Sequence, residues 1–211
     1  MGGFPDDTLL DYVLGLARGS SVLYVPTASA EDPATIVSWY ERLRGRATVT
    51  HLNFFPWPPA GLRELALAQD VIIVAGGNTA NALAIWRLHR FDEILRQAWE
   101  SEILLTGWSA GMICWFEHGI TDSFGPELAP MECLGLLAGS ACPHYDGEER
   151  RRPVYTELVA NGFTPGIAAD DDVALHFADG ELREVVTTRD GATAYRVSSD
   201  GETALEARLL T

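Results

Sequence analysis

The segment Ile103-Leu104-Leu105-Thr106-Gly107-Trp108-Ser109-Ala110-Gly111-Met112-Ile113 joins an apolar run, a Gly-x-Ser-x-Gly motif and a second apolar run. This order predicts a strand, a tight turn that carries Ser109, and a helix, which is the setting of a nucleophile elbow. Small residues beside the serine let the backbone approach closely, and the hydroxyl then projects at the carboxyl edge of a sheet. The segment therefore predicts an α/β hydrolase with Ser109 as its nucleophile.

Similar short apolar runs precede this segment and alternate with helical patterns. The predicted strands are residues 21–25, 48–52, 71–74 and 103–105, and the predicted helices are residues 33–44, 78–89 and 91–99. Continuous apolar runs are typical of parallel strands that are covered on both faces. Alternation of such strands with helices predicts an α/β fold of three layers around a mostly parallel sheet.

The last third of the chain has a different pattern. From residue 166 onward, short strand-like runs are separated by Asp-Gly pairs, which are strong hairpin signals. These pairs are residues 179–180, 190–191 and 200–201. We expect a C-terminal antiparallel β meander beside the main sheet, and, because no linker separates the two parts, a single domain over residues 1–211.

Composition limits the classes of partner. The formal net charge is −15, which disfavours nucleic acid and anionic membranes as partners. The sequence has no apolar run long enough to span a membrane, and its first residues do not resemble a signal peptide, so we expect a cytoplasmic protein. Its three cysteines have no metal-binding spacing. We therefore expect no structural metal.

A serine nucleophile needs a general base, and His144 is the best candidate among the five histidines. It follows a strand-like segment and precedes a helical one, so its loop is expected at the carboxyl edge of the sheet. The other four are expected to be structural or surface residues: His51, His89, His118 at the far end of the helix after Ser109, and His176.

The third member of a triad is a carboxylate that orients the base. Asp122 is our first choice because it lies between Ser109 and His144, which gives the chain order of α/β hydrolases. The spacing leaves Glu117 and Glu127 open as alternatives.

Two backbone amides are candidates for binding an oxyanion. The Ala110 amide begins the helix after the nucleophile. Gly76-Gly77-Asn78-Thr79 follows a predicted strand and opens a helix, so glycine there leaves amides bare. We assign the second oxyanion donor to Gly77.

Taken together, Gly76-Gly77-Asn78-Thr79, Gly107-Trp108-Ser109-Ala110-Gly111 and Pro143-His144-Tyr145 resemble the peptidase E family of aspartyl dipeptidases, with cyanophycinases as more distant relatives. The resemblance spans most of the chain. It implies a fold similar to class I glutamine amidotransferases, with Ser109, His144 and Asp122 as triad and Gly77 and Ala110 as oxyanion donors. It also implies hydrolysis of dipeptides with N-terminal aspartate, without metal or cofactor.

The resemblance further implies an arginine that holds the substrate's aspartate side chain. Arg150 is the nearest match, with Arg151 and Arg152 as alternatives. Gly2-Gly3-Phe4 resembles the family's first glycine loop, so we expect the family's first strand to be missing or trimmed. We expect a monomer or homodimer whose partner is a small peptide substrate. A cyanophycinase-like or broader exopeptidase, or a non-catalytic amidotransferase-like binding domain, remains an alternative.

Overall fold

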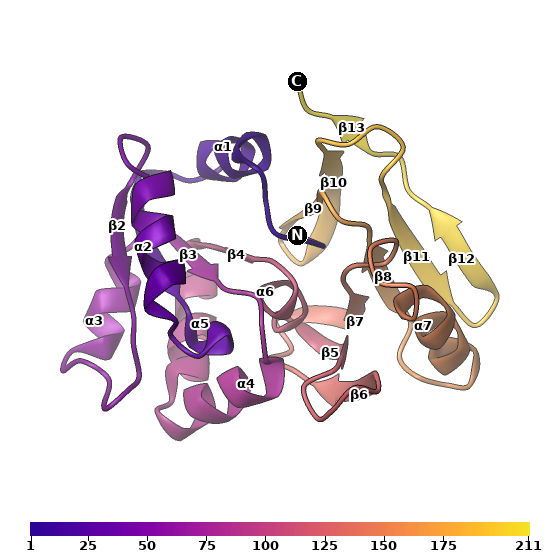
Figure 1. Ribbon diagram of the computed structural model, residues 1–211, viewed down its shortest axis with the longest axis horizontal. Coiled ribbons are helices and arrows are strands. Elements are labelled where there is room, and N and C mark those ends of the chain that lie inside the picture. Colours follow the sequence, from indigo (N-terminus) through magenta and orange to yellow (C-terminus); the bar gives the residue numbers. More distant parts are fainter.

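The four apolar runs form one parallel sheet in the computed structural model, which describes residues 1–211. The strands lie in the order β2-β1-β3-β4, and all three pairings between them are parallel (Figure 1). Their bounds are β1 (Ser21–Val25), β2 (Thr48–His51), β3 (Val71–Val74) and β4 (Leu104–Gly107). The predicted parallel strands are confirmed, with small differences at their ends.

Helices connect these strands, and some of them begin at a residue whose side chain caps the helix. Asp32 accepts a hydrogen bond from the Thr35 amide at 2.9 Å, and Asn78 accepts one from the Asn81 amide at 2.9 Å. The helices of this half are α1 (Asp7–Gly15), α2 (Pro33–Arg42), α3 (Leu62–Leu67), α4 (Thr79–Leu88) and α5 (Phe91–Glu100), with a 3₁₀ turn η1 (Thr27–Ser29).

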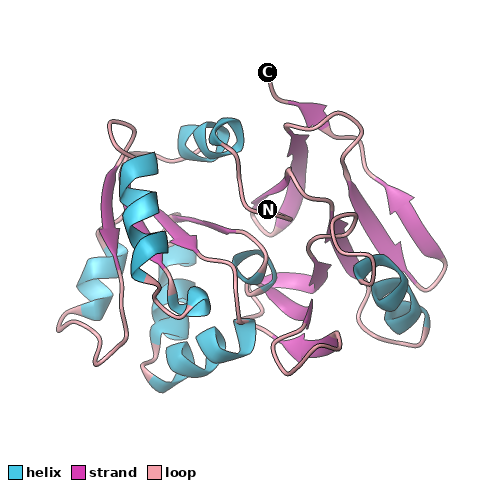
Figure 2. Cartoon of the chain, viewed as in Figure 1, coloured by secondary structure: helices cyan, strands magenta, loops and turns pink.

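Alternate residues of the strands enter two different cores. In β1, Leu23 packs in a cluster that contains Trp86 of α4, whereas Tyr24 packs in a second cluster that contains Trp39 of α2. Successive side chains of a strand point to opposite faces of its sheet, so helices cover both faces. The predicted three-layer α/β arrangement is confirmed (Figure 2).

The rest of the chain adds two further sheets. A six-stranded sheet has the order β12-β11-β8-β7-β5-β6, and a three-stranded sheet has the order β13-β10-β9. Their strands are β5 (Phe116–Thr121), β6 (Ala129–Glu132), β7 (Leu137–Cys142), β8 (Gly166–Ala169), β9 (Val173–Ala178), β10 (Glu181–Thr187), β11 (Ala194–Ser198), β12 (Gly201–Ala204) and β13 (Arg208–Leu209), with helices α6 (Ala110–Ile113) and α7 (Arg151–Ala160). The pair β7–β8 is parallel, so both strands end at the same edge.

The predicted C-terminal antiparallel strands are present and are divided between these two sheets. The Asp-Gly pair at 179–180 links β9 to β10, and the pair at 200–201 links β11 to β12. One local prediction is wrong: His118 lies in strand β5, because the helix after Ser109 ends at Ile113. None of the helices is both long and apolar enough to cross a lipid bilayer.

Candidate active site

Ser109 occupies the turn between β4 and α6. Its φ of 54° and ψ of −112° lie in a region that residues other than glycine rarely adopt. Backbone strain of this kind persists only where the surroundings hold it, and it is concentrated at functional sites. The turn therefore has the sharp geometry of a nucleophile elbow around a half-buried serine.

The glycines of the Gly-x-Ser-x-Gly motif are required by the neighbouring strand. A Cβ atom on Gly107 would lie 2.5 Å from the Val74 carbonyl oxygen, and one on Gly111 would lie 2.2 Å from the same oxygen. Both distances are shorter than any van der Waals contact. The elbow therefore packs its backbone directly on β3, which no other residue type would permit.

The two candidate oxyanion donors have no hydrogen-bond partner within the protein. The amides of Gly77 and Ala110 donate no hydrogen bond within the protein. The turn that precedes Gly77 lies against the elbow, because a Cβ atom on Gly76 would be 3.3 Å from the Cβ atom of Ser109. Two unused amides beside a strained serine are the arrangement that an oxyanion hole needs.

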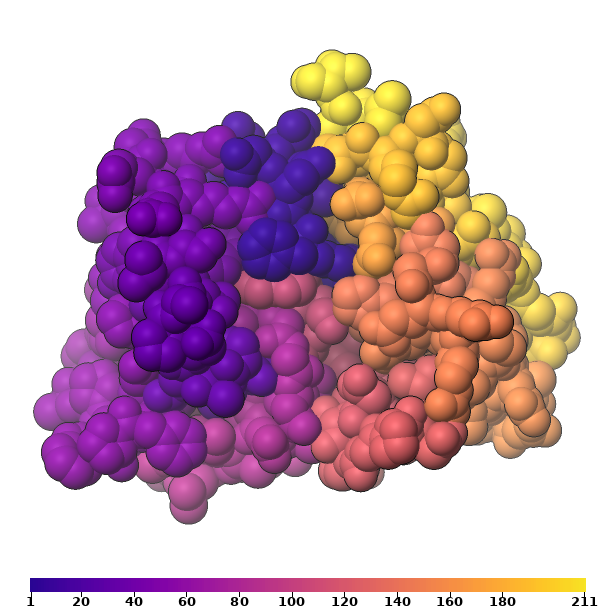
Figure 3. Space-filling model, in the orientation of Figure 1, coloured from indigo at the N-terminus to yellow at the C-terminus, as the bar shows by residue number.

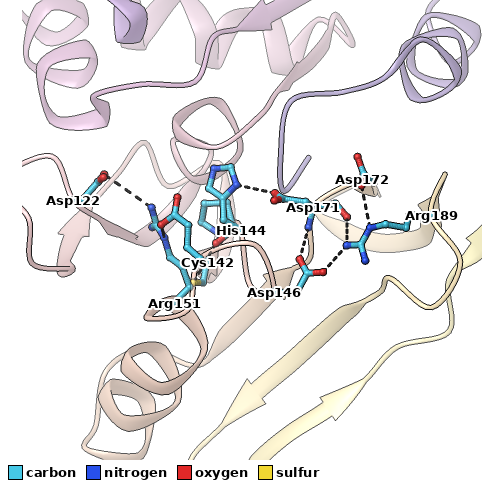
Figure 4. Close-up of polar contacts among 10 residues, drawn as sticks. Asp122, Cys142, His144, Asp146, Arg151, Asp171, Asp172 and Arg189 are labelled. Carbon is cyan, nitrogen blue, oxygen red and sulfur yellow. Dashed lines mark hydrogen bonds and ion pairs between the residues drawn. The ribbon is translucent and has the colours of Figure 1, made fainter.

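His144 contacts a carboxylate that differs from the one predicted. Its Nδ1 lies 2.7 Å from Oδ1 of Asp171, and both side chains are partly exposed (Figure 4). His144 follows β7 and Asp171 follows β8, so the shared edge of these parallel strands brings the two loops together. A carboxylate on Nδ1 fixes the tautomer that leaves Nε2 free to accept a proton.

The carboxylates chosen from the sequence lie elsewhere. Asp122 has no hydrogen bond to His144; it is 60% exposed and its Oδ1 lies 4.0 Å from the guanidinium of Arg151. Glu117 accepts a hydrogen bond from the Gly139 amide at 2.8 Å. Glu127 pairs with Arg150. The structure thus corrects the contact expected for Asp122, because the chain order that favoured it carries no information about loops that follow the histidine.

The loop that carries Asp171 is held by several polar contacts. The Asp171 amide donates to Oδ1 of Asp146 at 2.9 Å, and the Asp171 carbonyl accepts from Arg189 at 3.1 Å. Arg189 also donates to Asp146 at 2.5 Å and to Asp172 at 3.0 Å. A single guanidinium therefore joins the side chains of Asp146 and Asp172 to the backbone of Asp171, whose carboxylate faces His144 (Figure 4).

Two arginines of the predicted trio are already paired with surface carboxylates, Arg150 with Glu127 and Arg152 with Glu202. The ion pair with Glu127 raises the pKa of Arg150 and lowers that of Glu127. Arg151 differs because its side chain is only 4% exposed. It donates to Glu148 at 2.7 Å and to the Ile120 carbonyl at 3.0 Å, and its remaining nitrogen faces Asp122 loosely.

Contacts connect the segments that carry Ser109 and His144, although no hydrogen bond joins these two residues directly. On one side, the Ser109 amide donates to the Met1 carbonyl at 3.2 Å, and Gly3 lies against the Asp171 carboxylate. On the other side, Asn78 donates to the Ser123 carbonyl at 3.0 Å, next to Asp122. Catalytic hydrogen bonds are often long before substrate binds.

Comparison with known proteins identifies the family. A family model for peptidase family S51 matches residues 5–185, most of the chain. The chain belongs to peptidase family S51. It is accordingly a serine-type peptidase, a hydrolase of the peptidase E and cyanophycinase family, and the predicted resemblance is confirmed.

Individual relatives agree with this S51 assignment. The uncharacterized peptidase YgaJ of Bacillus subtilis (strain 168) is 45% identical over 204 residues, which cover 93% of this chain and 88% of that protein. A crystal structure of a peptidase from an acI-B1 Actinobacterium has a TM-score of 0.65 at 17% identity, covering 95% of this chain and 87% of the other. A candidate peptidase E from Listeria monocytogenes EGD-e also gives a TM-score of 0.65, at 16% identity, with 93% and 96% covered. At these identities the two structures bear on the fold, which is class I glutamine amidotransferase-like as predicted.

Proposed function

We propose that this S51 peptidase hydrolyses short peptides, above all dipeptides with N-terminal aspartate, through an acyl-enzyme on Ser109. One observation supports the proposal: the N-terminal residues connect the 2.7 Å contact between His144 and Asp171 to a strained serine turn with two unengaged amides, because Met1 bonds to Ser109 and Gly3 lies against Asp171. Nucleophile, base, orienting carboxylate and oxyanion donors are the parts that acyl transfer requires.

In the proposed reaction, the Ser109 hydroxyl attacks the scissile carbonyl carbon and its proton passes to Nε2 of His144. The amides of Gly77 and Ala110 donate to the oxyanion, where one donor is worth about 3 kcal/mol of barrier. The C–N bond then breaks, and the leaving amine takes the proton from His144. Water attacks the resulting ester, gives its proton to His144, and releases the acid while Ser109 regains its hydrogen.

For the aspartate side chain of the substrate, we propose Arg151 in place of Arg150. A buried guanidinium binds a carboxylate more strongly than an exposed one, because the local dielectric is lower. Arg151 is buried and has one nitrogen with only a 4.0 Å contact, to Asp122, which a substrate carboxylate can replace. Arg150 is 52% exposed and is engaged by Glu127.

The test compares Ser109→Ala with the matched control Ser38→Ala, at an exposed serine of α2. We expect hydrolysis of Asp-Leu to fall by at least about 10⁴-fold in the first variant and to stay unchanged in the second. Near-normal turnover by Ser109→Ala would refute the nucleophile.

Specificity is tested separately with Asp-Leu, Ala-Leu, N-acetyl-Asp-Leu and aspartyl-arginine polymer. We expect Asp-Leu to be preferred, and Arg151→Lys to lower kcat/KM for Asp-Leu by about tenfold or more while sparing Ala-Leu. Arg150→Lys serves as the control. Faster cleavage of the polymer, or equal rates on Asp-Leu and Ala-Leu, would refute the aspartyl dipeptidase proposal.

A further inference from the structure

Phe4 is an exposed aromatic residue beside the serine turn. It is 52% exposed, and its ring lies edge-on to that of Trp108, with the ring centroids 5.1 Å apart. Trp108 directly precedes Ser109 in the elbow. Single exposed apolar side chains are common on protein surfaces and need no explanation by themselves. Phe4 differs from such residues because its neighbours hold the ring in one position next to the nucleophile.

The inner side of the Phe4 ring packs on a cluster of aromatic side chains. The Trp39 ring centroid lies 6.0 Å from that of Phe4, and Trp39 stacks on Trp108 at 5.3 Å. Tyr24 of β1 stacks in turn on Trp39 of α2 at 5.0 Å, and both of these residues are fully buried. The aromatic cluster therefore extends from the core to the surface, where half of Phe4 is open to solvent.

Arg42 of α2 holds Phe4 from a second direction. The central carbon of its guanidinium lies 4.9 Å from the centre of the Phe4 ring, which is a cation–π contact. The same guanidinium donates to the Pro5 carbonyl and, at 2.8 Å, to Asp7, so it also holds the backbone that follows Phe4. A side chain that is already held in place loses little conformational entropy when a ligand covers it.

The backbone places Phe4 between the two parts of the site. The Met1 carbonyl accepts a hydrogen bond from the Ser109 amide at 3.2 Å, and a Cβ atom on Gly3 would lie 2.4 Å from Oδ1 of Asp171. The segment that ends at Phe4 therefore contacts both the elbow and the carboxylate that orients the base. The N-terminal residues, coloured indigo, reach the surface between the two halves of the molecule (Figure 3).

The two ends of a bound dipeptide have different neighbours. In the proposed function, the acyl residue lies beside Arg151, which faces Asp122. The leaving amine takes its proton from His144, and Gly3 lies against the carboxylate that contacts this histidine. We therefore expect the leaving residue beside Gly3 and Phe4.

We propose that Phe4 is a specificity-determining residue, whose exposed ring contacts the side chain of the leaving residue and favours an apolar one such as leucine. The aromatic cluster below the ring and Arg42 beside it hold the ring in place for this contact. The proposal rests on the proposed function, because a leaving residue exists only if the site cleaves peptides.

The test measures kcat/KM for Ala-Leu and Ala-Gly in the wild-type chain and in Phe4→Ala. Both substrates have the same acyl residue, so the ratio of their kcat/KM values reports on the leaving residue. We expect the wild-type chain to prefer Ala-Leu, and Phe4→Ala to lower this ratio by about fivefold or more, because the leucine side chain loses an apolar contact that removes it from water. The change should lie in KM, since the contact also exists in the bound ground state. An unchanged ratio in Phe4→Ala would overturn the proposal.

Two control variants separate Phe4 from other exposed apolar residues. Leu88, at the end of α4, is 77% exposed, and Leu88→Ala should leave the ratio unchanged. Phe124 is 67% exposed and follows Ser123, next to the residues assigned to the acyl side. A fall of the ratio in Phe124→Ala instead of Phe4→Ala would place the leaving residue beside Ser123 and overturn the proposal, as would an equal fall in Leu88→Ala.

A binding measurement separates this proposal from the proposed function. In Ser109→Ala, which lacks the nucleophile, Asp-Leu should bind about fivefold more tightly than Asp-Gly in isothermal titration calorimetry, and adding Phe4→Ala should remove the difference. Equal wild-type rates on Asp-Leu and Ala-Leu would refute the aspartyl preference and still leave the ratio of Ala-Leu to Ala-Gly measurable. Equal affinities for Asp-Leu and Asp-Gly in Ser109→Ala would overturn the role of Phe4, whatever the acyl preference.

Discussion

The carboxylates of Asp122 and Asp171 have different surroundings. Asp171 is flanked by Gly3 and Gly147, where a Cβ atom would lie 2.4 and 2.1 Å from its oxygens, and its own amide is bonded to Asp146. Asp122 is mostly exposed and faces Arg151. A carboxylate held on several sides can keep an imidazole in one tautomer, whereas an exposed one moves freely. The neighbours that hold the Asp171 carboxylate in place therefore favour Asp171 over Asp122 as the residue that orients His144.

Asp171→Asn should therefore lower kcat by about 10³–10⁴-fold, because an amide at this position favours the wrong tautomer of His144. Asp122→Asn is the matched control and should retain most of the activity on Ala-Leu. Steady-state kinetics of both variants decide the matter. Loss of activity in Asp122→Asn with normal activity in Asp171→Asn would restore the assignment made from chain order.

Some residues of the site can be predicted from a short stretch of sequence, and others only from the order of the strands in the sheet. Ser109 and its glycines are found in one contiguous motif, and His144 in a recognisable strand-to-loop sequence. The contact of His144 with Asp171 spans twenty-seven positions and depends on β7 and β8 being neighbours. The sequence signal for this carboxylate is the run Asp170-Asp171-Asp172 after a strand-like segment. Only the pairing of β7 with β8 shows that this run lies beside His144.

At the level of elements, two loops after neighbouring strands carry the base and its carboxylate, and a third loop, after β10, carries Arg189. The guanidinium of Arg189 contacts Asp146, Asp171 and Asp172 across these loops. Exposed ion pairs contribute little to global stability, commonly about 0–1 kcal/mol. The contribution of Arg189 is therefore expected in the position of the Asp171 loop.

Arg189→Gln should lower kcat by about 10- to 100-fold, as a small displacement of a catalytic group can, while Tm changes little. Arg183→Gln is the control: Arg183 lies in β10 and its substitution removes an exposed ion pair with Asp179. The pH profile of kcat should change only in the Arg189 variant, because the imidazole loses a fixed partner. Unchanged kcat and profile would show that the loop holds without Arg189.

Elements with strong local signals were predicted well, and those decided by tertiary contacts were not. The apolar run after Ser109 fits a helix or a strand equally well, since periodicity cannot separate short buried segments. The chain leaves the helix because the Trp115 carbonyl accepts from the Leu136 and Leu137 amides at 2.8 and 2.9 Å. This partner segment lies 21 and 22 residues later in the chain, so the end of the short helix cannot be predicted from local sequence.

For the whole molecule, the buried amino terminus connects stability to pH. Burial lowers the pKa of the Met1 amino group from 8.0 to about 5. The unfolded chain then binds a proton at a higher pH than the folded chain, so stability is full above about pH 8 and is lost as pH falls to about 5. Three pKa units correspond to at most about 4 kcal/mol.

We expect the free energy of unfolding in urea to fall from pH 8 to pH 5 more steeply for the free amino terminus than for a chain acetylated before refolding. Carboxylates titrate in both chains, so the difference isolates the terminus; intact mass verifies that Met1 is retained. Identical pH profiles would show that the amino group is solvated in the folded state.

The hidden terminus has a practical consequence, because all fifteen basic side chains in this sequence are arginines. This sequence therefore holds one primary amine, the α-nitrogen of Met1, and folding encloses it. Crosslinkers, dyes and sensor surfaces that rely on acylating lysine have no target on the folded exterior. The rate of reaction with such a reagent would instead measure how often the structure opens locally and exposes the Met1 amino group.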